Sequence, residues 1–342
     1  MTERPVQREL VGIAIGAGHF GPIQLDSWRR VRGARIEAVC DRNLTAARSA
    51  AERFTVPRFG AAVEELVDQV RPDFIDVVTR PESHRELIEF AIDRKLHVLC
   101  QKPLAPSLEE AQTLVRRCND AGVRLMVTEI WRWQPWYRKV RQMITAGEIG
   151  QPFHARFVSR RSDGRGHAPF QRQPYFRDMP RLLIYESVIH LIDVVRFLCG
   201  RITSVQCLHR QLNPKIAGED FCLLTLTTAA NVTVTIDAHR HGPAQQSQTS
   251  EHLVVEGEAG SLELRTDGAI LLRSIDGDVR ELRTEWPAEG YLGDSCRACL
   301  QHFADGLHTG EPFETAGNDN LETLAVVFAA YESAASGSRV TL

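Results

Sequence analysis

Residues 11–21 read VGIAIGAGHFG, an apolar run followed by glycines at the spacing G-x-G-x-x-G. The apolar run is typical of a buried parallel strand, and a helix pattern follows from Phe20 to about Val31. Gly16 allows a tight turn, Gly18 allows a ligand to approach the backbone, and Gly21 allows the helix to pack on the strand. The stretch therefore predicts a strand, a glycine-rich turn and a helix, the first unit of a doubly wound sheet.

Strand and helix patterns continue to alternate through the first third of the chain. Further apolar runs fit buried strands at Ile36–Cys40, Phe74–Val78, His97–Cys100 and Arg124–Val127. Helix patterns fit between them near Ala61–Gln69, His84–Lys95 and Ser107–Ala121. Repeated strand–helix units with short turns predict an N-terminal α/β Rossmann domain, with a doubly wound parallel sheet, over residues 1–128.

After Trp131 the pattern changes. Pro135–Ala146 and Asn320–Ala335 fit helices. Alternating polar and apolar side chains mark longer strands at Phe153–Arg160, Ile202–Arg210, Phe221–Thr228, Val232–Ala238, His252–Glu256 and Ser261–Arg265. Such alternation is typical of strands with one covered face and one open face. Residues 129–342 are therefore predicted to form an α+β domain with a large, mostly antiparallel, open-faced sheet.

The composition narrows the class of protein. The 342 residues are 43% hydrophobic and 25% charged, with a formal net charge of −3, so neither nucleic acid nor an anionic membrane is an expected partner. Met1–Leu10 has no apolar signal-like core, and acidic and basic residues interrupt the apolar stretch Leu182–Leu198. The cysteines are scattered, and the C-x-x-C of Cys296 and Cys299 has no second pair. We expect a cytoplasmic protein without a metal site.

Asp41 ends the second predicted strand, at the distance from the glycines that a dinucleotide site requires. A carboxylate there accepts hydrogen bonds from adenosine ribose hydroxyls and repels a 2′-phosphate, which favours NAD. Arg42 keeps NADP open, because a guanidinium can pair with a 2′-phosphate or stack on adenine. His19 and Phe20 lie at the start of the helix, where N–H groups and the helix dipole favour a bound pyrophosphate.

Glu186, His190 and Asp193 follow the spacing i, i+4, i+7 and predict one polar stripe on an otherwise apolar helix. Charged groups are seldom buried unless they are paired or functional. The spacing leaves two interpretations open. One is a structural network in which a carboxylate satisfies a core histidine. The other is a catalytic site in which His190 removes a hydroxyl proton.

Gln101-Lys102-Pro103 follows the strand pattern His97–Cys100. Ligands of a doubly wound sheet bind at the carboxyl ends of its strands. A lysine placed there can polarise or deprotonate an alcohol beside a nicotinamide ring, although a lysine that ends a strand is usually solvated surface. Lys102 is therefore a candidate catalytic residue, and Pro103 fixes the turn that follows it.

These features in this order resemble the glucose–fructose oxidoreductase / inositol dehydrogenase / MocA (Gfo/Idh/MocA) family. The segments that carry the resemblance are Val11–Gly18, Ala38–Arg42, His97–Ala105, His190–Asp193, Glu256–Leu262, Tyr331–Ser333 and Arg339–Leu342. They cover nearly the whole chain. The resemblance implies an NAD-dependent oxidoreductase that acts on a CH–OH group of a sugar or cyclitol, either a ring carbinol or an anomeric carbon that becomes a lactone.

The resemblance also implies residue roles. Lys102 and His190 match catalytic positions, and Glu186 matches an acid one turn earlier that is usually Asp. With the motif, it predicts cofactor contacts at Gly16, Gly18, His19, Phe20, Gly21, Asp41, Arg42, Thr79, Pro81, His84, Gln101, Lys102 and Arg132. Substrate contacts are predicted at Lys102, Trp133, Tyr175, Arg177, Glu186 and His190. Gln101 departs from the family's usual Glu, and Glu186 from its usual Asp.

Residues 173–181, QPYFRDMPR, resemble a segment of a branched-pentose (D-apiose) type of sugar dehydrogenase. Tyr175 and Arg177 can pair with vicinal hydroxyls, although an exposed polar loop fits the composition equally. The alternatives are an inositol or cyclitol dehydrogenase, an enzyme that uses the dinucleotide only as a transient oxidant, and a non-catalytic sugar- or NAD-sensing protein. The open sheet face predicts a homodimer or homotetramer.

Overall fold

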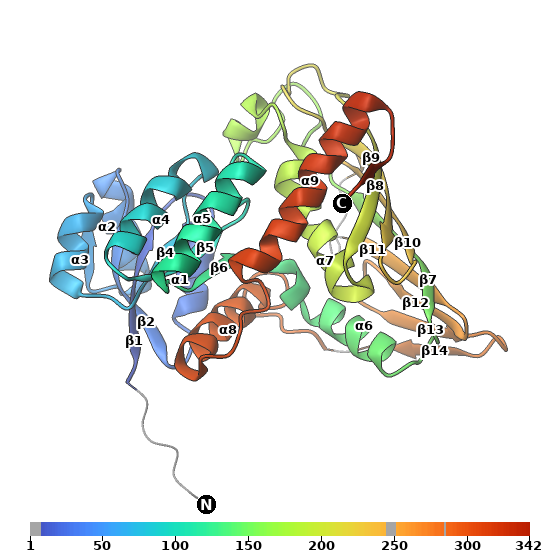
Figure 1. Cartoon of the computed structure of the whole chain (residues 1–342), viewed down its shortest axis with the longest axis horizontal. Helices are drawn as coiled ribbons and strands as arrows, with labels where there is room; N and C mark the ends of the chain where they lie inside the picture. The colour runs from blue at the N-terminus through green and yellow to red at the C-terminus, as the bar shows by residue number, and fades with distance from the viewer. Residues whose placement is uncertain (1–7, 244–250, 284) are drawn as a thin grey trace, which may run out of the picture. The chain divides into compact units, whose positions relative to one another are not determined.

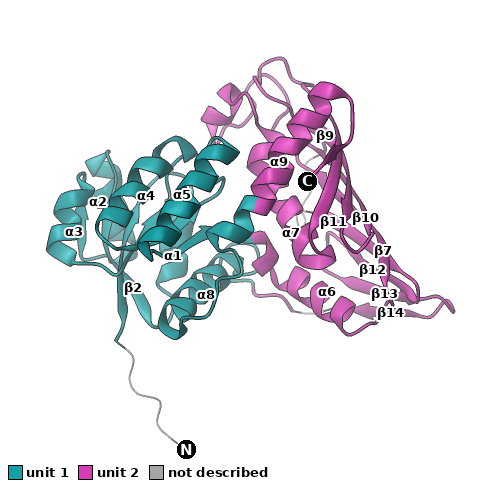
Figure 2. Cartoon of the chain, in the orientation of Figure 1, with its two compact units in different colours: residues 1–130, 288–321 teal, residues 131–287, 322–342 magenta. Residues whose placement is uncertain are grey.

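The computed structural model describes residues 8–243, 251–283 and 285–342. Most of Met1–Leu10, the segment in which we expected no secretion signal, lies outside the described residues. The chain forms two compact units, each made of two stretches (Figure 2). Unit 1 comprises Met1–Ile130 and Ala288–Leu321, and unit 2 comprises Trp131–Pro287 and Glu322–Leu342. The predicted division after residue 128 treats each domain as continuous, and the two divisions differ mainly over residues 288–321.

Unit 1 contains, within the described residues, a six-stranded parallel sheet in the order β3-β2-β1-β4-β5-β6 (Figure 1). Its strands are β1 (Leu10–Ile15), β2 (Ala34–Cys40), β3 (Arg58–Gly60), β4 (Phe74–Val77), β5 (His97–Gln101) and β6 (Leu125–Thr128). Its helices are α1 (Gly21–Trp28), α2 (Leu44–Phe54), α3 (Val63–Val70), the 3-10 turn η1 (Pro81–Ser83), α4 (His84–Asp93), α5 (Leu108–Ala121) and α8 (Ser295–Thr309). The strand order reverses between β1 and β4, which confirms the predicted doubly wound sheet.

An aromatic cluster joins helices of unit 1 to its sheet. The Phe74 ring of β4 lies 5.2 Å from Trp28 of α1 and 5.3 Å from Phe303 of α8, measured between ring centroids. Gly12 of β1 leaves room for that ring, because a Cβ at this position would lie 2.3 Å from an atom of Phe74. Burial of these aromatic rings explains why α8 packs with the first unit although it lies late in the sequence.

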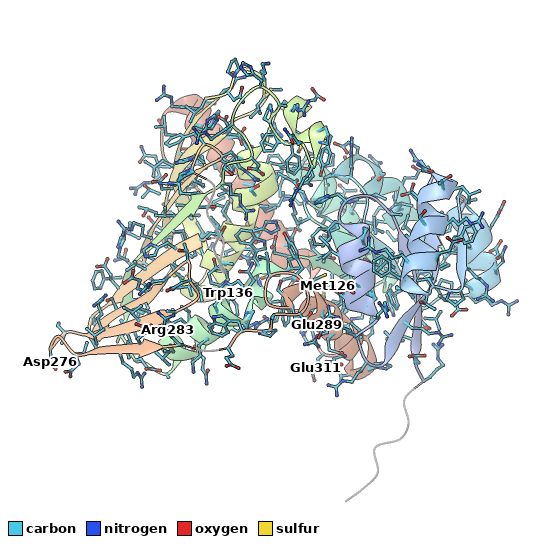
Figure 3. The ribbon with its side chains drawn as sticks, turned by 180° about the vertical axis from the view of Figure 1, so that it is seen from behind. Met126, Trp136, Asp276, Arg283, Glu289 and Glu311 are labelled. Atoms are coloured by element: carbon cyan, nitrogen blue, oxygen red, sulfur yellow. The ribbon has the colours of Figure 1, made fainter. Side chains whose placement is uncertain are left out.

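Unit 2 contains, among the residues described, a nine-stranded sheet in the order β14-β13-β12-β11-β7-β10-β9-β8-β15. Its strands are β7 (Pro152–Arg160), β8 (Ile202–Arg210), β9 (Phe221–Thr228), β10 (Thr233–His239), β11 (Glu251–Gly257), β12 (Gly260–Leu264), β13 (Ile270–Ser274), β14 (Val279–Leu282) and β15 (Val340–Thr341). Only the β7–β10 pair of this described sheet is parallel, which confirms the prediction of a mostly antiparallel sheet. Asp276 marks the tip of the β13–β14 hairpin (Figure 3).

Helices cover one face of this sheet. They are η2 (Trp131–Trp133), α6 (Pro135–Thr145), η3 (Pro174–Asp178), the π-helix η4 (Leu183–Val188), α7 (Ile189–Cys199) and the part of α9 (Gly317–Ser336) that begins at Glu322. Trp136 of α6, labelled in Figure 3, is 1% exposed. Its ring packs edge-on against Trp286. Along β7, β9 and β10, buried and more exposed side chains alternate, so the predicted open face is confirmed.

Three further findings concern predicted absences. None of the helices in the described part of the chain combines the length and the apolar composition that a membrane span requires. All eight cysteines are buried thiols outside any disulfide, and Cys296 and Cys299 lie one turn apart on α8. The ranges 8–243, 251–283 and 285–342 hold no group of three or more His, Cys, Asp or Glu side chains suited to a metal ion.

Candidate cofactor and substrate sites

The glycine-rich turn links β1 to α1. Gly16 has a φ of +110°, and a Cβ there would lie 2.5 Å from the carbonyl oxygen of Val78. A Cβ at Gly21 would lie 2.6 Å from the carbonyl oxygen of Gly16, whereas a Cβ at Gly18 would meet no atom within 4 Å. The fold itself therefore requires Gly16 and Gly21, while Gly18 leaves exposed backbone that a phosphate can approach.

The N-terminus of α1 faces the same turn without a side-chain cap. Its N-cap residue, Phe20, makes no capping hydrogen bond through its side chain, and a proline follows in the first turn. The first N–H groups of a helix and its positive dipole end favour an anion. The exposed Gly18 and His19 beside this helix end fit the pyrophosphate of a dinucleotide.

Asp41 ties the end of β2 to the glycine-rich turn. Its Oδ2 accepts a hydrogen bond from the backbone N–H of Ala17 at 2.7 Å, and its Oδ1 accepts one from Asn43 at 2.8 Å. Each carboxylate oxygen has a second lone pair, which a ribose hydroxyl can use. The Arg42 side chain is 86% exposed and lies 3.6 Å from the carboxylate of Glu86. The negative charge of Glu86 therefore offsets the attraction of Arg42 for a 2′-phosphate.

His84 supports the loop after β4. Its Nε2 lies 3.1 Å from the carbonyl oxygen of Thr79, and its Nδ1 lies 3.1 Å from that of Leu104. The ring is fully buried, and burial lowers the pKa of His84. Thr79 also accepts a hydrogen bond from the hydroxyl of Ser83, beside Pro81 at the start of η1. The structure places His84 beneath this loop, and direct cofactor contacts of Thr79, Pro81 and His84 stay predictions.

A buried hydrogen-bond chain fixes the residue before Lys102. Gln101 Nε2 donates to Gln24 Oε1 at 2.8 Å, and Gln24 Nε2 donates to Asp76 Oδ1 at 2.6 Å. Trp28 Nε1 donates to Asp76 Oδ2 at 2.7 Å, and burial raises the pKa of Asp76 to about 7. The amide of Gln101 thus serves as a donor in the interior. The next peptide bond, Lys102–Pro103, is cis, and the lysine is partly exposed.

Glu186 and His190 lie on two different kinds of helix. Glu186 belongs to the π-helix η4 and is partly exposed, whereas His190 lies in the first turn of α7 and is 8% exposed. The prediction of one regular α-helix through these residues is therefore wrong for Glu186, which lies in a π-helix. A residue distant in sequence acts here: Glu219 accepts hydrogen bonds from the backbone N–H groups of Leu182 and Ile184, where η4 begins. π-Helical turns are frequent at functional sites.

The helix α7 carries an aromatic stack and a buried ion pair. The indole of Trp131 is parallel to the imidazole of His190, with ring centroids 4.7 Å apart and 5° between the planes. Arg132 donates to both carboxylate oxygens of Asp193, at 2.7 and 2.5 Å, and both side chains are buried. Asp193 therefore takes part in a buried ion pair with an arginine, which neither interpretation of the stripe had named. A cofactor contact of Arg132 stays a prediction.

The predicted substrate residues outside α7 make packing contacts within unit 2. Trp133 lies under a guanidinium of α6, 3.9 Å from its ring. Tyr175 packs edge-on against Phe176 at 4.7 Å, and Arg177 Nε donates to the carbonyl oxygen of Pro169 at 2.7 Å. These contacts order the segment that leads to η4. Substrate contacts of Trp133, Tyr175 and Arg177 stay predictions.

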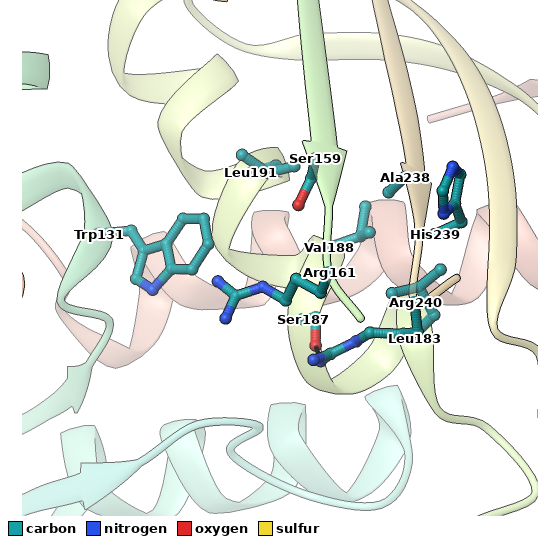
Figure 4. A pocket seen from close by; sticks show the side chains of 10 residues that line it. All are labelled: Trp131, Ser159, Arg161, Leu183, Ser187, Val188, Leu191, Ala238, His239 and Arg240. Carbon is teal, nitrogen blue, oxygen red and sulfur yellow. Dashed lines mark hydrogen bonds between the residues drawn. The ribbon is translucent and has the colours of Figure 1, made fainter. Parts of the chain in front are cut away.

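A pocket that the sequence did not predict lies wholly within unit 2 (Figure 4). Its lining residues are Trp131, Ser159, Arg161, Leu183, Ser187, Val188, Leu191, Ala238, His239 and Arg240. Arg161 directly follows β7 and Arg240 directly follows β10, and these two strands are parallel neighbours. The sequence does show an arginine directly after each of these two strands. Only the pairing of β7 with β10 brings the two arginines to one pocket.

Buried charge surrounds this pocket. Burial lowers the pKa of Arg240, as does the nearby Arg161 cation, whereas Asp163 and Glu186 act in the opposite direction. Burial raises the pKa of Glu251 to about 7, although the Arg161 cation, 3.5 Å away, favours its charged form. The pocket wall therefore holds two arginines, and the buried carboxyl group of Glu251 lies beside one of them.

Comparisons with known proteins agree with this arrangement. Residues 11–129 match the model of the Gfo/Idh/MocA oxidoreductase family with an NAD-binding Rossmann fold, and residues 137–263 match the family's C-terminal domain. A D-apiose dehydrogenase from Rhizobium rhizogenes is 33% identical over 341 residues, which is 98% of each chain. The chain belongs to the Gfo/Idh/MocA family. A second D-apiose dehydrogenase, from Paraburkholderia graminis, is 34% identical over 97% of this chain and 89% of the relative.

Among solved structures, an oxidoreductase from Agrobacterium radiobacter, in complex with NAD+, L-tartaric acid and magnesium, has a TM-score of 0.91 and 32% identity. The alignment covers 97% of this chain and 98% of that one. The family assignment confirms the predicted resemblance, the two-part fold, NAD as the cofactor and the class of NAD-dependent dehydrogenase.

Proposed function

We propose that this protein is an NAD-dependent sugar dehydrogenase that oxidises a carbinol or anomeric carbon, with D-apiose as the first substrate to test. One observation carries the proposal. A chain that matches two D-apiose dehydrogenases over nearly its whole length keeps a lysine, Lys102, after β5 and a histidine, His190, at the start of α7. A histidine can supply the base, and a lysine the hydrogen-bond donor, that oxidation of an alcohol uses.

The proposed chemistry divides the work among three side chains. NAD, held at Gly16–Gly21 and Asp41, supplies the hydride acceptor when it is bound. His190 takes the proton of the substrate hydroxyl, and the stack with Trp131 sets the plane of its ring. Lys102 donates a hydrogen bond to the same oxygen and stabilises its negative charge. Glu186 stabilises the imidazolium that forms.

A substrate panel tests this function. Purified protein is given D-apiose, D-xylose, D-glucose or myo-inositol with NAD or NADP, and the absorbance of the reduced nicotinamide is followed. We expect D-apiose with NAD to give the highest kcat/KM. Lys102→Met and His190→Asn should each lower kcat by about 10²- to 10⁴-fold. Lys139→Met, at a lysine of α6 that bonds only its helix neighbour Gln142 among described residues, should leave kcat unchanged.

Each alternative predicts a different result in this panel. A preference for myo-inositol would make the protein a cyclitol dehydrogenase. Turnover of a sugar without net NADH would support a transient-oxidant mechanism. Binding of sugar and NAD without any turnover would support a sensing protein, and unchanged kcat in Lys102→Met and His190→Asn would overturn the residue assignment.

We also propose that a second copy of this chain covers the open face of the unit 2 sheet, to give a homodimer or homotetramer. Leu208 of β8 and Leu223 of β9 lie opposite each other and are 55% and 41% exposed. Phe153 of β7 is 53% exposed. Exposed apolar side chains on a sheet face favour association. Light scattering should show an oligomer that Leu223→Lys dissociates and that Leu212→Lys, at a leucine beyond the end of β8, leaves intact.

We propose a cytoplasmic location as well. Eight cysteines that form no disulfide are typical of a reducing compartment. Fractionation of cells that express the native protein would test this, and recovery with a secreted marker would contradict it.

A further inference from the structure

Arg161 and Arg240 occupy equivalent places at the ends of two neighbouring strands. β7 and β10 run parallel, and their last paired residues are Arg160 and His239. The residues that follow these two, Arg161 and Arg240, therefore leave the two strands side by side. Both arginines line the pocket shown in Figure 4, together with the hydroxyls of Ser159 and Ser187. Two guanidinium groups on one small pocket repel each other, so an anion placed between them would be stabilised by both.

Arg240 is the fixed cation of this pair. It is 5% exposed, and its Nη1 donates to both carboxylate oxygens of Asp163, at 3.1 and 2.9 Å. Its Nη2 donates to the hydroxyl of Ser187, and its buried Nε has no hydrogen-bond partner among the described residues. These contacts hold the guanidinium at the pocket wall with a donor left over.

Arg161 is the more accessible cation. Its side chain is 33% exposed, and its guanidinium lies 5.7 Å from the ring centroid of Trp131, the residue that stacks on His190. Its charged partner among the described residues is Glu251, at 3.5 Å, which is long for a hydrogen bond. A guanidinium carries five N–H donors, so this one contact leaves several of them for a ligand.

We propose that this pocket is an anion subsite that binds the carboxylate of a small hydroxy acid, with Arg161 as its direct partner and Arg240 as the second charge. The planar guanidinium matches a planar carboxylate through two parallel hydrogen bonds. Leu183, Val188 and Leu191 line the same pocket and offer apolar contacts to the carbon chain of such an acid. The proposal goes beyond the proposed function, because D-apiose carries no charge, and it concerns the binding of an anion without turnover.

Calorimetric titration of the full-length protein, without added NAD, tests the subsite. The probes are L-tartrate and erythritol, a four-carbon polyol without charge. We expect L-tartrate to bind and erythritol to give no detectable heat. Arg161→Gln should weaken L-tartrate binding about tenfold or more. Arg156→Gln removes an exposed arginine from the opposite face of β7 and should leave the dissociation constant unchanged.

Several outcomes would overturn the subsite. Equal binding of L-tartrate by wild type and Arg161→Gln would show that the guanidinium is not the partner. Equal binding of erythritol and L-tartrate would show that charge is not recognised, and tighter binding of inorganic phosphate than of L-tartrate would contradict the carboxylate. Arg161→Lys keeps the charge without the fork, and we expect it to bind L-tartrate with an intermediate dissociation constant.

The subsite and the proposed function fail separately. The titration needs no turnover, so L-tartrate binding that depends on Arg161 supports the subsite even where no sugar reduces NAD. Conversely, NADH formation from D-apiose together with L-tartrate binding that ignores Arg161 supports the dehydrogenase and overturns the subsite.

Discussion

The indole of Trp131 and the imidazole of His190 are stacked face to face, 4.7 Å apart and 5° from parallel. This contact fixes the plane of the ring that we propose as the base. Trp131→Leu should therefore lower kcat about tenfold to a hundredfold, because small misplacements of a reacting group are costly. Trp131→Phe keeps an aromatic face and should retain more activity. The KM for NAD should not change, and equal kcat in both variants would show that the stack does not position His190.

Substitutions at two glycines of the cofactor turn should have different effects, one on NADH binding and the other on the stability of the fold. Gly18→Ala adds a Cβ in open space, so the melting temperature without NAD should stay the same. The dissociation constant of NADH should rise about tenfold or more, because the Cβ takes the space of the pyrophosphate.

Gly21→Ala is the matched comparison. Its Cβ would lie 2.6 Å from the carbonyl oxygen of Gly16, so it should destabilise the fold by about 1–3 kcal/mol even without cofactor. Thermal unfolding and fluorescence titration of NADH measure the two effects. Loss of stability in Gly18→Ala without loss of NADH affinity would contradict the assignment.

Asp41 should control the choice between NAD and NADP. Asp41→Ala removes the carboxylate that we expect to accept from the ribose, so the ratio of kcat/KM for NAD to that for NADP should fall about tenfold. NAD affinity should fall as well, because the same carboxylate holds the backbone of Ala17. Arg42→Ala should leave NAD kinetics unchanged and lower kcat/KM for NADP. An unchanged ratio in Asp41→Ala would mean that other residues discriminate.

The sequence predicted the features that depend on local pattern. Period-two alternation identified most strands of the open-faced sheet, and the G-x-G-x-x-G spacing identified the turn between β1 and α1. Both signals lie within a dozen residues of chain, where steric and packing rules are strong. The short strands β3, β13, β14 and β15 were not predicted, because two to five residues carry no clear period.

Features that depend on distant pairing could not be predicted. Arg161 and Arg240 share a pocket only because β7 pairs in parallel with β10, some eighty positions later. The π-helix before His190 depends on Glu219, a residue that lies beyond α7 in the sequence. The assignment of Asp193 to an ion pair required the position of Arg132, which no periodicity gives.

The buried carboxyl of Glu251 should make stability depend on pH. Burial raises its pKa from an ordinary 4.5 to about 7. Between these values the folded protein holds a proton that the unfolded chain has released, so the free energy of unfolding should fall as the pH rises through this window. The full effect is on the order of 3 kcal/mol.

Glu251→Gln isolates this contribution. The variant and wild type should have similar stability at pH 5, where Glu251 is protonated, and the variant should be more stable at pH 8. Asp76, whose pKa is also raised to about 7, is present in both proteins, so its contribution cancels in the comparison. Denaturant unfolding at the two pH values provides the measurement. A stability difference that does not change with pH would contradict the raised pKa.

Glu219 should act on catalysis through the start of the helix that carries His190. Its carboxylate accepts from the backbone N–H groups of Leu182 and Ile184 and from the hydroxyl of Tyr331, at 3.3, 2.9 and 2.6 Å. Glu219→Gln can keep Oε1 as an acceptor, but it removes the negative charge and puts an NH2 group where Oε2 accepts a second contact from the Leu182 N–H at 3.3 Å, so it should destabilise the fold by about 1–3 kcal/mol.

The same variant should lower kcat, because η4 carries Glu186 and leads directly into His190. NAD affinity should not change, because the glycine-rich turn belongs to unit 1. Glu322→Gln, at an exposed acid that pairs with Arg196, removes the same charge and should leave both parameters unchanged. Retention of full kcat by Glu219→Gln, despite a lower melting temperature, would show that Glu219 stabilises unit 2 without positioning the proposed base.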